Sequence, residues 1–329
     1  MPKLSEHENY LRMLKGEVPE YVPRMGPWRV SWTGITPPPG ATEDFVDPFG
    51  VEYVVEKTAN NGALPKPGDF MLDDVRRWRD VIKRPAILDE YNYEMMAKKI
   101  LDERDPTLPK FGGGSIGNGY FMLLMSFMGF NNGLVACIEE PDEVKALLNF
   151  LLEINLELGK KFIEYIKPDA YSMGDDIAHE RAPFVSDAVF LDQFEPVWRA
   201  TVKQYKDEGL PAEHHNCGYF EPFVKYIVDM GFNSWNPAQP CNDLVGIKKT
   251  YGRKLAIVGG FAGNGFVSWP ETTEEEIRAY VRQVLDELAP GGGYSFGGAI
   301  MGVPDDPITT ERNGWIRDEF ELNRYKYYN

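Results

Sequence analysis

The chain has 329 residues, of which 43% are hydrophobic, and a formal net charge of −16. This length is enough to bury one large core, and the acidity disfavours nucleic acid as a partner because phosphate backbones are repelled. Three widely spaced cysteines do not form a disulfide framework, and no apolar run approaches the roughly 18–20 residues of a membrane span. The N-terminus is polar and unlike a signal peptide. We therefore expect a globular, cytoplasmic protein with no membrane partner.

The first 60 residues show no regular pattern. They contain three prolines at 37–39 and the aromatic residues Trp28 and Trp32. We interpret residues 1–60 as an N-terminal extension over the mouth of the main fold, within a single domain that spans 1–329.

Two segments stand out in the first half of the chain. Residues 109–119, PKFGGGSIGNG, predict a strand that leads into a glycine-rich turn; no Gly-Lys-Ser/Thr comes after it, so this is not a phosphate-binding loop. Residues 141–166 predict a long amphipathic helix, with proline at its start and acidic residues in its first turn.

From about residue 170, short strands and helices alternate. The expected strands are 169–176, 211–218, 232–240, 253–261 and 293–299, and the expected helices are 186–209, 219–231, 242–252 and 272–293. The last helix has Thr272 or Thr273 placed for a capping box with Glu275 or Glu276. The alternation predicts a parallel sheet with helices outside it, and its repetition favours a closed (β/α)8 barrel over a doubly wound sheet.

In a barrel of this kind, chemistry takes place at the carboxyl ends of the strands. Unusual polar residues come directly after three successive predicted strands. These residues are Asp175, Asp176, His179 and Glu180, then His214, His215 and Cys217, then Asn236, Gln239 and Cys241.

The His-x-Cys spacing within HHNCG is half of a plausible zinc site. Alternate side chains of an extended segment point the same way, so His215 and Cys217 can face one metal, and Gly218 lets the chain turn away. Glu180 is our expected third ligand. Other candidate ligands are His214, His179, Asp176 and Cys241. The competing interpretation is that the pair is purely structural, as an isolated His-x-Cys usually is.

A family resemblance joins these segments. DDIAHERAPFVS, HHNCG, GFNSWNPAQP, DLVGIKKTYGRKLAIVGGF and LAPGGGYSFGGA together resemble the uroporphyrinogen decarboxylase superfamily from roughly residue 105 to 310. HHNCG resembles the cobalamin-dependent methyltransferase branch of that superfamily. The resemblance implies a (β/α)8 barrel, a zinc ion, and a corrinoid that is carried by a partner protein.

Departures from the family patterns narrow the function. The decarboxylase signature, similar to RQAGRY, is replaced by PRMGPWRVSW, where Arg24 and Arg29 are the nearby residues able to bind substrate carboxylates. Thiol-methylating members carry a ligand cysteine near the last strand, where this chain has Gly298 and Ala299. An oxygen ligand such as Glu180 would leave zinc a harder Lewis acid, suited to a methyl ether. The resemblance therefore implies an O-demethylase that moves methyl from a methoxylated aromatic compound to cob(I)alamin.

This scheme assigns roles to the remaining residues. Asp176 would stabilise the leaving oxygen, with Glu180 on the metal. Asn236 and Gln239 would hydrogen-bond the substrate. Apolar walls would come from Trp28, Trp32, Phe121 and Met125, for which core packing is the competing interpretation, as helix or turn capping is for Asp175 and Asp176.

The sequence leaves alternative functions open. They are a methylcorrinoid:thiol methyltransferase, a cofactor-free decarboxylase, and an inactive barrel that serves as a binding protein. The chain contains no DxHxxG-type corrinoid-binding segment, so methyl transfer would require a separate corrinoid protein.

Overall fold

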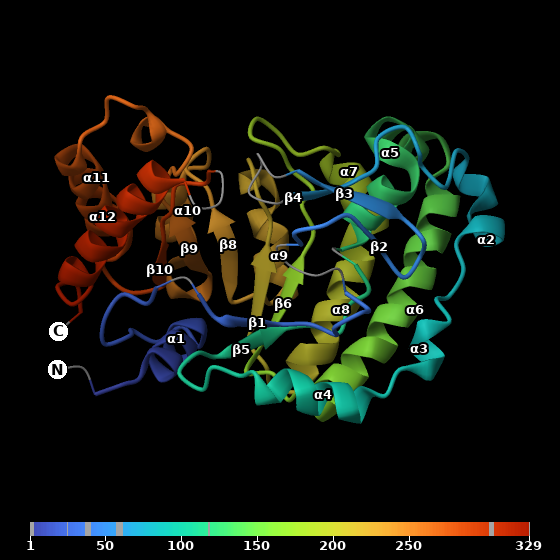
Figure 1. Ribbon diagram of the computed structural model, residues 1–329, viewed down its shortest axis with the longest axis horizontal. Coiled ribbons are helices and arrows are strands. Elements are labelled where there is room, and N and C mark those ends of the chain that lie inside the picture. Colours follow the sequence, from blue (N-terminus) through green and yellow to red (C-terminus); the bar gives the residue numbers. More distant parts are fainter. Residues whose placement is uncertain are drawn as a thin grey trace.

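The computed structural model describes residues 3–24, 26–36, 41–56, 62–117, 119–302 and 306–328; the prolines at 37–39 and Asn118 of the glycine-rich turn lie outside these ranges. Its main sheet has seven parallel strands in the order β1-β5-β6-β7-β8-β9-β10 (Figure 1). The strands are β1 (Trp28–Val30), β5 (Lys110–Gly112), β6 (Ala170–Gly174), β7 (Ala212–His215), β8 (Ser234–Ala238), β9 (Ala256–Gly260) and β10 (Tyr294–Gly297).

The sheet curls back on itself. Arg24, shortly before β1, forms an isolated parallel bridge with Phe296 of β10, at the opposite edge of the sheet. The predicted barrel-like α/β architecture is therefore confirmed, with seven strands and this bridge in the described part of the chain.

Helices cover the outside of the sheet (Figure 1). They are α1 (Glu6–Leu14), α2 (Trp78–Val81), α3 (Ile87–Glu90), α4 (Tyr93–Asp102), α5 (Tyr120–Glu139), α6 (Pro141–Tyr165), α7 (Asp187–Val189), α8 (Glu195–Asp207), α9 (Val224–Met230), α10 (Leu244–Tyr251), α11 (Glu274–Leu288) and α12 (Pro307–Asn323). The sequence predicted α6 and α11 closely, and the capping box of α11 pairs Thr273 with Glu276.

The N-terminal extension divides between the two ends of the barrel. Helix α1 closes the amino ends of the strands, where Tyr10 and Met13 pack against Phe111 of β5 and Ala256 of β9. A small antiparallel sheet of β2 (Phe45–Val46), β3 (Glu52–Glu56) and β4 (Gly62–Pro65) lies beside α5. There the Tyr53 hydroxyl donates to Ser126 Oγ at 3.1 Å. Within residues 1–60, α1 therefore plugs the amino ends and β1 is a strand of the main sheet, whereas β2 and β3 lie beside α5 toward the carboxyl ends (Figure 1).

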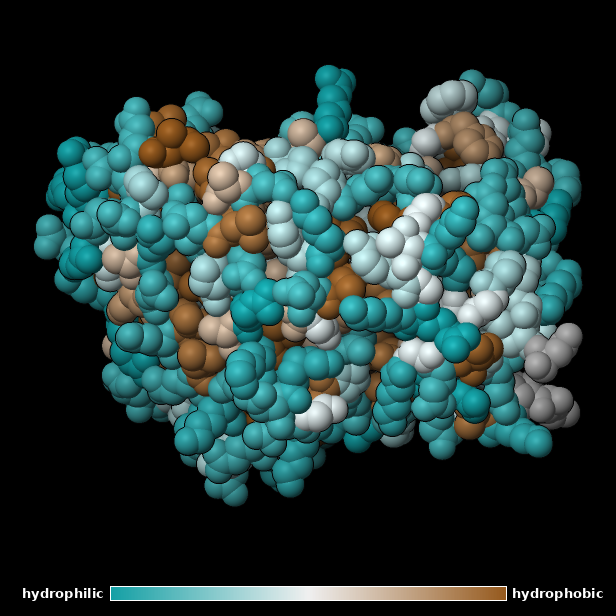
Figure 2. Space-filling model, turned by 180° about the vertical axis from the view of Figure 1, so that it is seen from behind, coloured by the Kyte–Doolittle hydropathy of each residue, from teal (hydrophilic) through white to brown (hydrophobic). Residues whose placement is uncertain are grey.

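Helix α5 is long and apolar enough to cross a membrane by length and composition, the one such helix in the described residues. In its most apolar window 61% of the residues are buried inside the protein, as in the core helix of a globular domain. Hydrophilic residues also cover most of the face seen in Figure 2.

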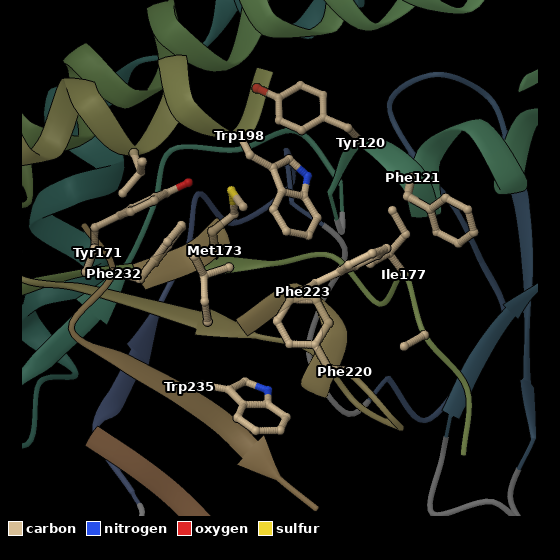
Figure 3. Close-up of a cluster of buried hydrophobic side chains, with 14 of the residues drawn as sticks. Tyr120, Phe121, Tyr171, Met173, Ile177, Trp198, Phe220, Phe223, Phe232 and Trp235 are labelled. Atoms are coloured by element: carbon tan, nitrogen blue, oxygen red, sulfur yellow. The ribbon is translucent and has the colours of Figure 1, made fainter. Parts of the chain in front are cut away.

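An aromatic core fills the space between the sheet and its helices. Trp198 of α8 and Trp235 of β8 lie in this core, together with Phe220 and Phe232 (Figure 3). His214 is fully buried among them, 4.5 Å from the Trp198 ring centroid, and neither ring nitrogen has a hydrogen-bond partner in the described residues. Burial, and then the adjacent His215, lower the pKa of His214 well below its usual value. His214 is therefore a neutral core residue.

This burial predicts a pH-dependent stability. Below about pH 6.5 the unfolded chain accepts a proton at His214 that the folded chain refuses, so His214 contributes a decline of roughly 1.4 kcal/mol per pH unit to the free energy of unfolding. Burial raises the pKa of Asp175 to about 7, and that group contributes a change of opposite sign over the same range, so the decline is read from the difference between a variant and the wild type. We expect His214→Phe to remove this decline, and the exposed control His179→Gln to keep it. Urea unfolding between pH 7.5 and 5.5 measures the slope; an unchanged slope in His214→Phe contradicts the assignment.

Candidate functional site

Three potential metal ligands converge at the carboxyl ends of β6 and β7. Asp176 comes shortly after β6, His215 ends β7, and Cys217 lies two residues beyond. One ligand atom from each lies within 4.8 Å of the other two, and they form the one such group among the described residues. His215 Nε2 is 3.8 Å from Cys217 Sγ and 3.9 Å from Asp176 Oδ1. Because β6 and β7 are parallel neighbours, with Gly174 opposite His215, their ends bring these side chains together.

Asn236 of β8 orients the imidazole of His215. His215 Nδ1 is 3.1 Å from Asn236 Oδ1, and the tautomer that carries its hydrogen on Nδ1 donates to this oxygen. Nε2 is then the bare nitrogen, and it is the one that faces Cys217 and Asp176. Metal-bound histidines are commonly oriented in this way, by a hydrogen bond from the ring nitrogen that is not on the metal.

Backbone contacts hold Cys217 in place. Its N–H donates to Asp176 Oδ1 at 2.8 Å, and the next N–H, of Gly218, donates to Gln239 Oε1. Gly218 has φ +80°, and a Cβ there would lie 2.6 Å from the His179 backbone, so only glycine fits. Asn242 adds a bond from Nδ2 to the Gly218 carbonyl at 2.9 Å.

Asp175, the residue before Asp176, anchors this end of β6. Its carboxylate accepts hydrogen bonds from the backbone N–H groups of Tyr120, Phe121 and Met122, at 2.9–3.1 Å, and from the indole of Trp198 at 2.8 Å. Asp175 thus caps the first turn of α5 and contacts α8. One member of the acidic pair is a cap, as the competing interpretation held, but it caps a helix that precedes it in the chain.

The surroundings of Cys217 favour its neutral thiol over the thiolate. Burial, and then the nearby Asp176 carboxylate, raise the pKa of the Cys217 thiol to about 12. A divalent cation would reverse this preference, because a coordinating thiol is deprotonated outright. Asp176 and His215 have side-chain exposed fractions of 37% and 40%, so the site is open to solvent.

The donor set fits zinc. Carboxylate, imidazole and thiolate are all zinc ligands, and tetrahedral zinc places N and S ligands about 3.5 Å apart, close to the distance between His215 and Cys217. Three protein ligands with an open fourth position are typical of catalytic zinc rather than of a structural site.

The other predicted ligands lie elsewhere. Glu180 is exposed and is not part of the ligand group, so Asp176 occupies the position expected for it. His214 points into the core, and the exposed His179 packs against Phe184, with ring centroids 5.1 Å apart. Cys241 is exposed and lies outside the group.

Some of the residues predicted to contact the substrate lie near the ligand group, and others do not. Asn236 and Gln239 are beside the ligands, where they bond to His215 and to the Gly218 N–H. Of the predicted apolar walls, Trp28 is partly exposed, whereas Trp32, Phe121 and Met125 are at most 2% exposed. Phe121 belongs to the core cluster shown in Figure 3. These three side chains pack in the core in this structure.

Comparison with protein families identifies the class of protein. The model of the uroporphyrinogen decarboxylase (URO-D) family matches residues 55–309. The chain therefore belongs to the uroporphyrinogen decarboxylase family. A comparison with curated protein sequences finds no significant match.

Solved structures share the fold. A methyltransferase from Methanosarcina mazei is 16% identical, with a TM-score of 0.67, over 97% of this chain and 100% of that one. Weaker similarities are to a B12-independent methionine synthase from a Shewanella species (10% identity, TM-score 0.41, 83% and 74% of the two chains) and to a 2,3-dimethylmalate lyase (12%, 0.26, 95% and 79%). At these identities the Methanosarcina likeness establishes the fold, and the other two carry no argument.

The role of Asn236 is testable through metal affinity. We expect Asn236→Ala to weaken zinc binding about 10- to 100-fold, because the imidazole loses the group that fixes its orientation. The matched control Asn149→Ala lies on the exposed face of α6. Competition with a chromophoric chelator measures both affinities, and equal affinities would show that Asn236 does not orient a ligand.

Proposed function

We propose that this protein is a zinc-dependent methyltransferase that moves a methyl group from a methyl ether, a methoxylated aromatic compound, to the cob(I)alamin of a separate corrinoid protein. The observation that carries the proposal is the convergence of Asp176, His215 and Cys217 at the barrel mouth. The family membership supports it, as does the fold shared with a protein described as a methyltransferase. We place this activity in the cytoplasm.

Each ligand has a defined task in this proposal. Asp176, His215 and Cys217 would hold the ion and leave one position open. When bound, zinc supplies Lewis acidity that stabilises the negative charge developing on the leaving oxygen. A carboxylate in place of a second thiolate makes the ion harder, which favours an ether oxygen over a thiol.

The chain itself contributes positioning and access. In the proposed reaction the methyl carbon would accept an electron pair from the cob(I)alamin of the partner protein as its bond to oxygen breaks, and the electrons of that bond would remain on the phenolate oxygen. Asn236 holds the imidazole, and the exposed fractions of Asp176 and His215 leave the centre accessible from the mouth, where the corrinoid protein would dock.

Two alternatives predict different products. A methylcorrinoid:thiol methyltransferase would consume a thiol and form a thioether. A cofactor-free decarboxylase would release carbon dioxide without a metal. Product analysis therefore separates both of them from ether demethylation.

Zinc content and methyl transfer should depend on the same residues. We expect about one zinc per chain in the wild type, and Asp176→Ala and Cys217→Ala to lose zinc and activity together, because two ligands do not retain the ion. The matched control Glu180→Ala should keep both. Elemental analysis measures zinc, and the absorbance of cob(I)alamin with methoxylated aromatics monitors transfer.

Three outcomes would contradict this assignment. Stoichiometric zinc in Cys217→Ala would show that Cys217 is not a ligand. Loss of zinc in Glu180→Ala would show that Glu180, rather than Asp176, is the third ligand. Zinc-loaded wild type that demethylates no aryl methyl ether, but methylates a thiol or releases carbon dioxide, would establish one of the alternatives.

A further inference from the structure

Two basic side chains meet at the amino end of the barrel, far from the ligand group at the mouth. Lys248 of α10 donates from Nζ to the carbonyl of Gly292, which lies in the glycine turn 291–293 just before β10. Arg253 follows α10, and a Cβ on Gly292, where φ is +80°, would lie 3.3 Å from Arg253 Cδ. The two basic side chains therefore contact the same glycine.

The described residues offer neither of these cations an acidic partner. Arg253 donates from Nε to the carbonyl of Gly16 at 2.8 Å and from Nη1 to the carbonyl of Gly291 at 3.5 Å. Both acceptors are neutral, and Nη2 has no hydrogen-bond partner in the part of the chain that the structure describes. This is notable in a chain with 51 acidic residues against 35 basic ones. Two neighbouring cations without a counter-ion attract an anionic ligand, and a guanidinium edge suits a phosphate.

The surroundings of Lys248 also make it a nucleophile. The side chain is partly buried, and burial, followed by the nearby Arg253, lowers the pKa of Lys248 to about 8. At pH 7.5 about a quarter of the Lys248 side chains are then neutral amines, compared with roughly one in a thousand for a lysine with a pKa of about 10.4. A neutral amine has a free electron pair, and burial or a second cation nearby activates lysines in this way.

We propose that Lys248 is acylated by acyl phosphates, with Arg253 binding the phosphate group of the reagent. In an acyl phosphate a single bridging oxygen separates the acyl carbon from the phosphorus, so a neighbouring amine and guanidinium can reach both groups. The site lies at the opposite end of the barrel from Asp176, His215 and Cys217, and the proposal does not rest on the proposed methyl transfer.

The acylation step is a simple acyl transfer. The electron pair of Lys248 Nζ attacks the acyl carbon, a carbon–nitrogen bond forms, and the bond from that carbon to the bridging oxygen breaks. The phosphate leaves with the electrons of the broken bond and with one proton from the amine, as HPO4²⁻. The product is a neutral amide, so the reaction removes the charge of Lys248 and its repulsion from Arg253.

Acetylation of the full chain by acetyl phosphate tests this proposal. Tandem mass spectrometry of the peptide that holds Lys248 and Lys249 gives the rate at each lysine. Lys249 is the matched control, because it is the next residue of α10 and is exposed to solvent. We expect Lys248 to react at least about 10-fold faster at pH 7.5, and its rate to rise with pH and level off above about pH 8.

Two reagents separate phosphate binding from the reactivity of the amine. N-Acetoxysuccinimide carries no charge, so it reports the reactivity of the amine alone. Arg253→Met should slow acetylation of Lys248 by acetyl phosphate about 10-fold and by N-acetoxysuccinimide at most about 3-fold, because only acetyl phosphate binds the guanidinium. The control Lys254→Met removes an exposed charge from the same turn and should slow neither reaction more than about 2-fold. Thermal unfolding checks that both variants fold.

The wild type provides a further test that needs no variant. Inorganic phosphate should slow its reaction with acetyl phosphate and leave its reaction with N-acetoxysuccinimide unchanged. Equal rates at Lys248 and Lys249 would overturn the proposal. An equal loss with both reagents in Arg253→Met would also overturn it, since the guanidinium would then act only on the amine.

Discussion

The site depends on Asp175 at the end of β6. Its carboxylate caps α5 and accepts from Trp198 of α8, its N–H donates to the His215 carbonyl at 3.1 Å, and its own carbonyl accepts from the Asn216 side chain. One residue therefore joins β6, β7 and two helices. This connection fixes the next residue, Asp176, beside Cys217, so the ligand group is a consequence of how the barrel is closed at this corner.

Successive residues of β7 face different surroundings. His214 points outward into the aromatic core, His215 points to the mouth, and Glu213 points into the barrel, where it pairs with Arg29 of β1. Strand geometry requires this alternation, since neighbouring side chains face opposite sides. The adjacent histidines thus lie in different surroundings: His214 is in the aromatic core, and His215 is in the group formed with Asp176 and Cys217.

Local sequence patterns were enough to predict the barrel and to single out His215 and Cys217, which the structure places beside one another. Alternating strands and helices indicated the fold, and His-x-Cys at a strand end indicated the pair. Local pattern could not select Asp176 over Glu180, because that choice depends on how the loop after β6 turns back against Cys217. Nor could it separate Phe121 and Met125 from the core, since an apolar side chain has the same pattern whether it lines a pocket or fills one. The sequence also indicates that Glu213 has a partner, because a charged residue in the middle of a buried strand requires one inside the barrel.

Zinc K-edge X-ray absorption of the zinc-loaded full chain would show directly whether one thiolate, one imidazole and one carboxylate form a metal centre at the barrel mouth. We predict a single sulfur at about 2.3 Å, with nitrogen and oxygen ligands at about 2.0–2.2 Å. Two sulfurs would mean that Cys241 joins Cys217 on the metal, and no sulfur would mean that the ion binds elsewhere. Either result would contradict the ligand set on which the proposed chemistry depends.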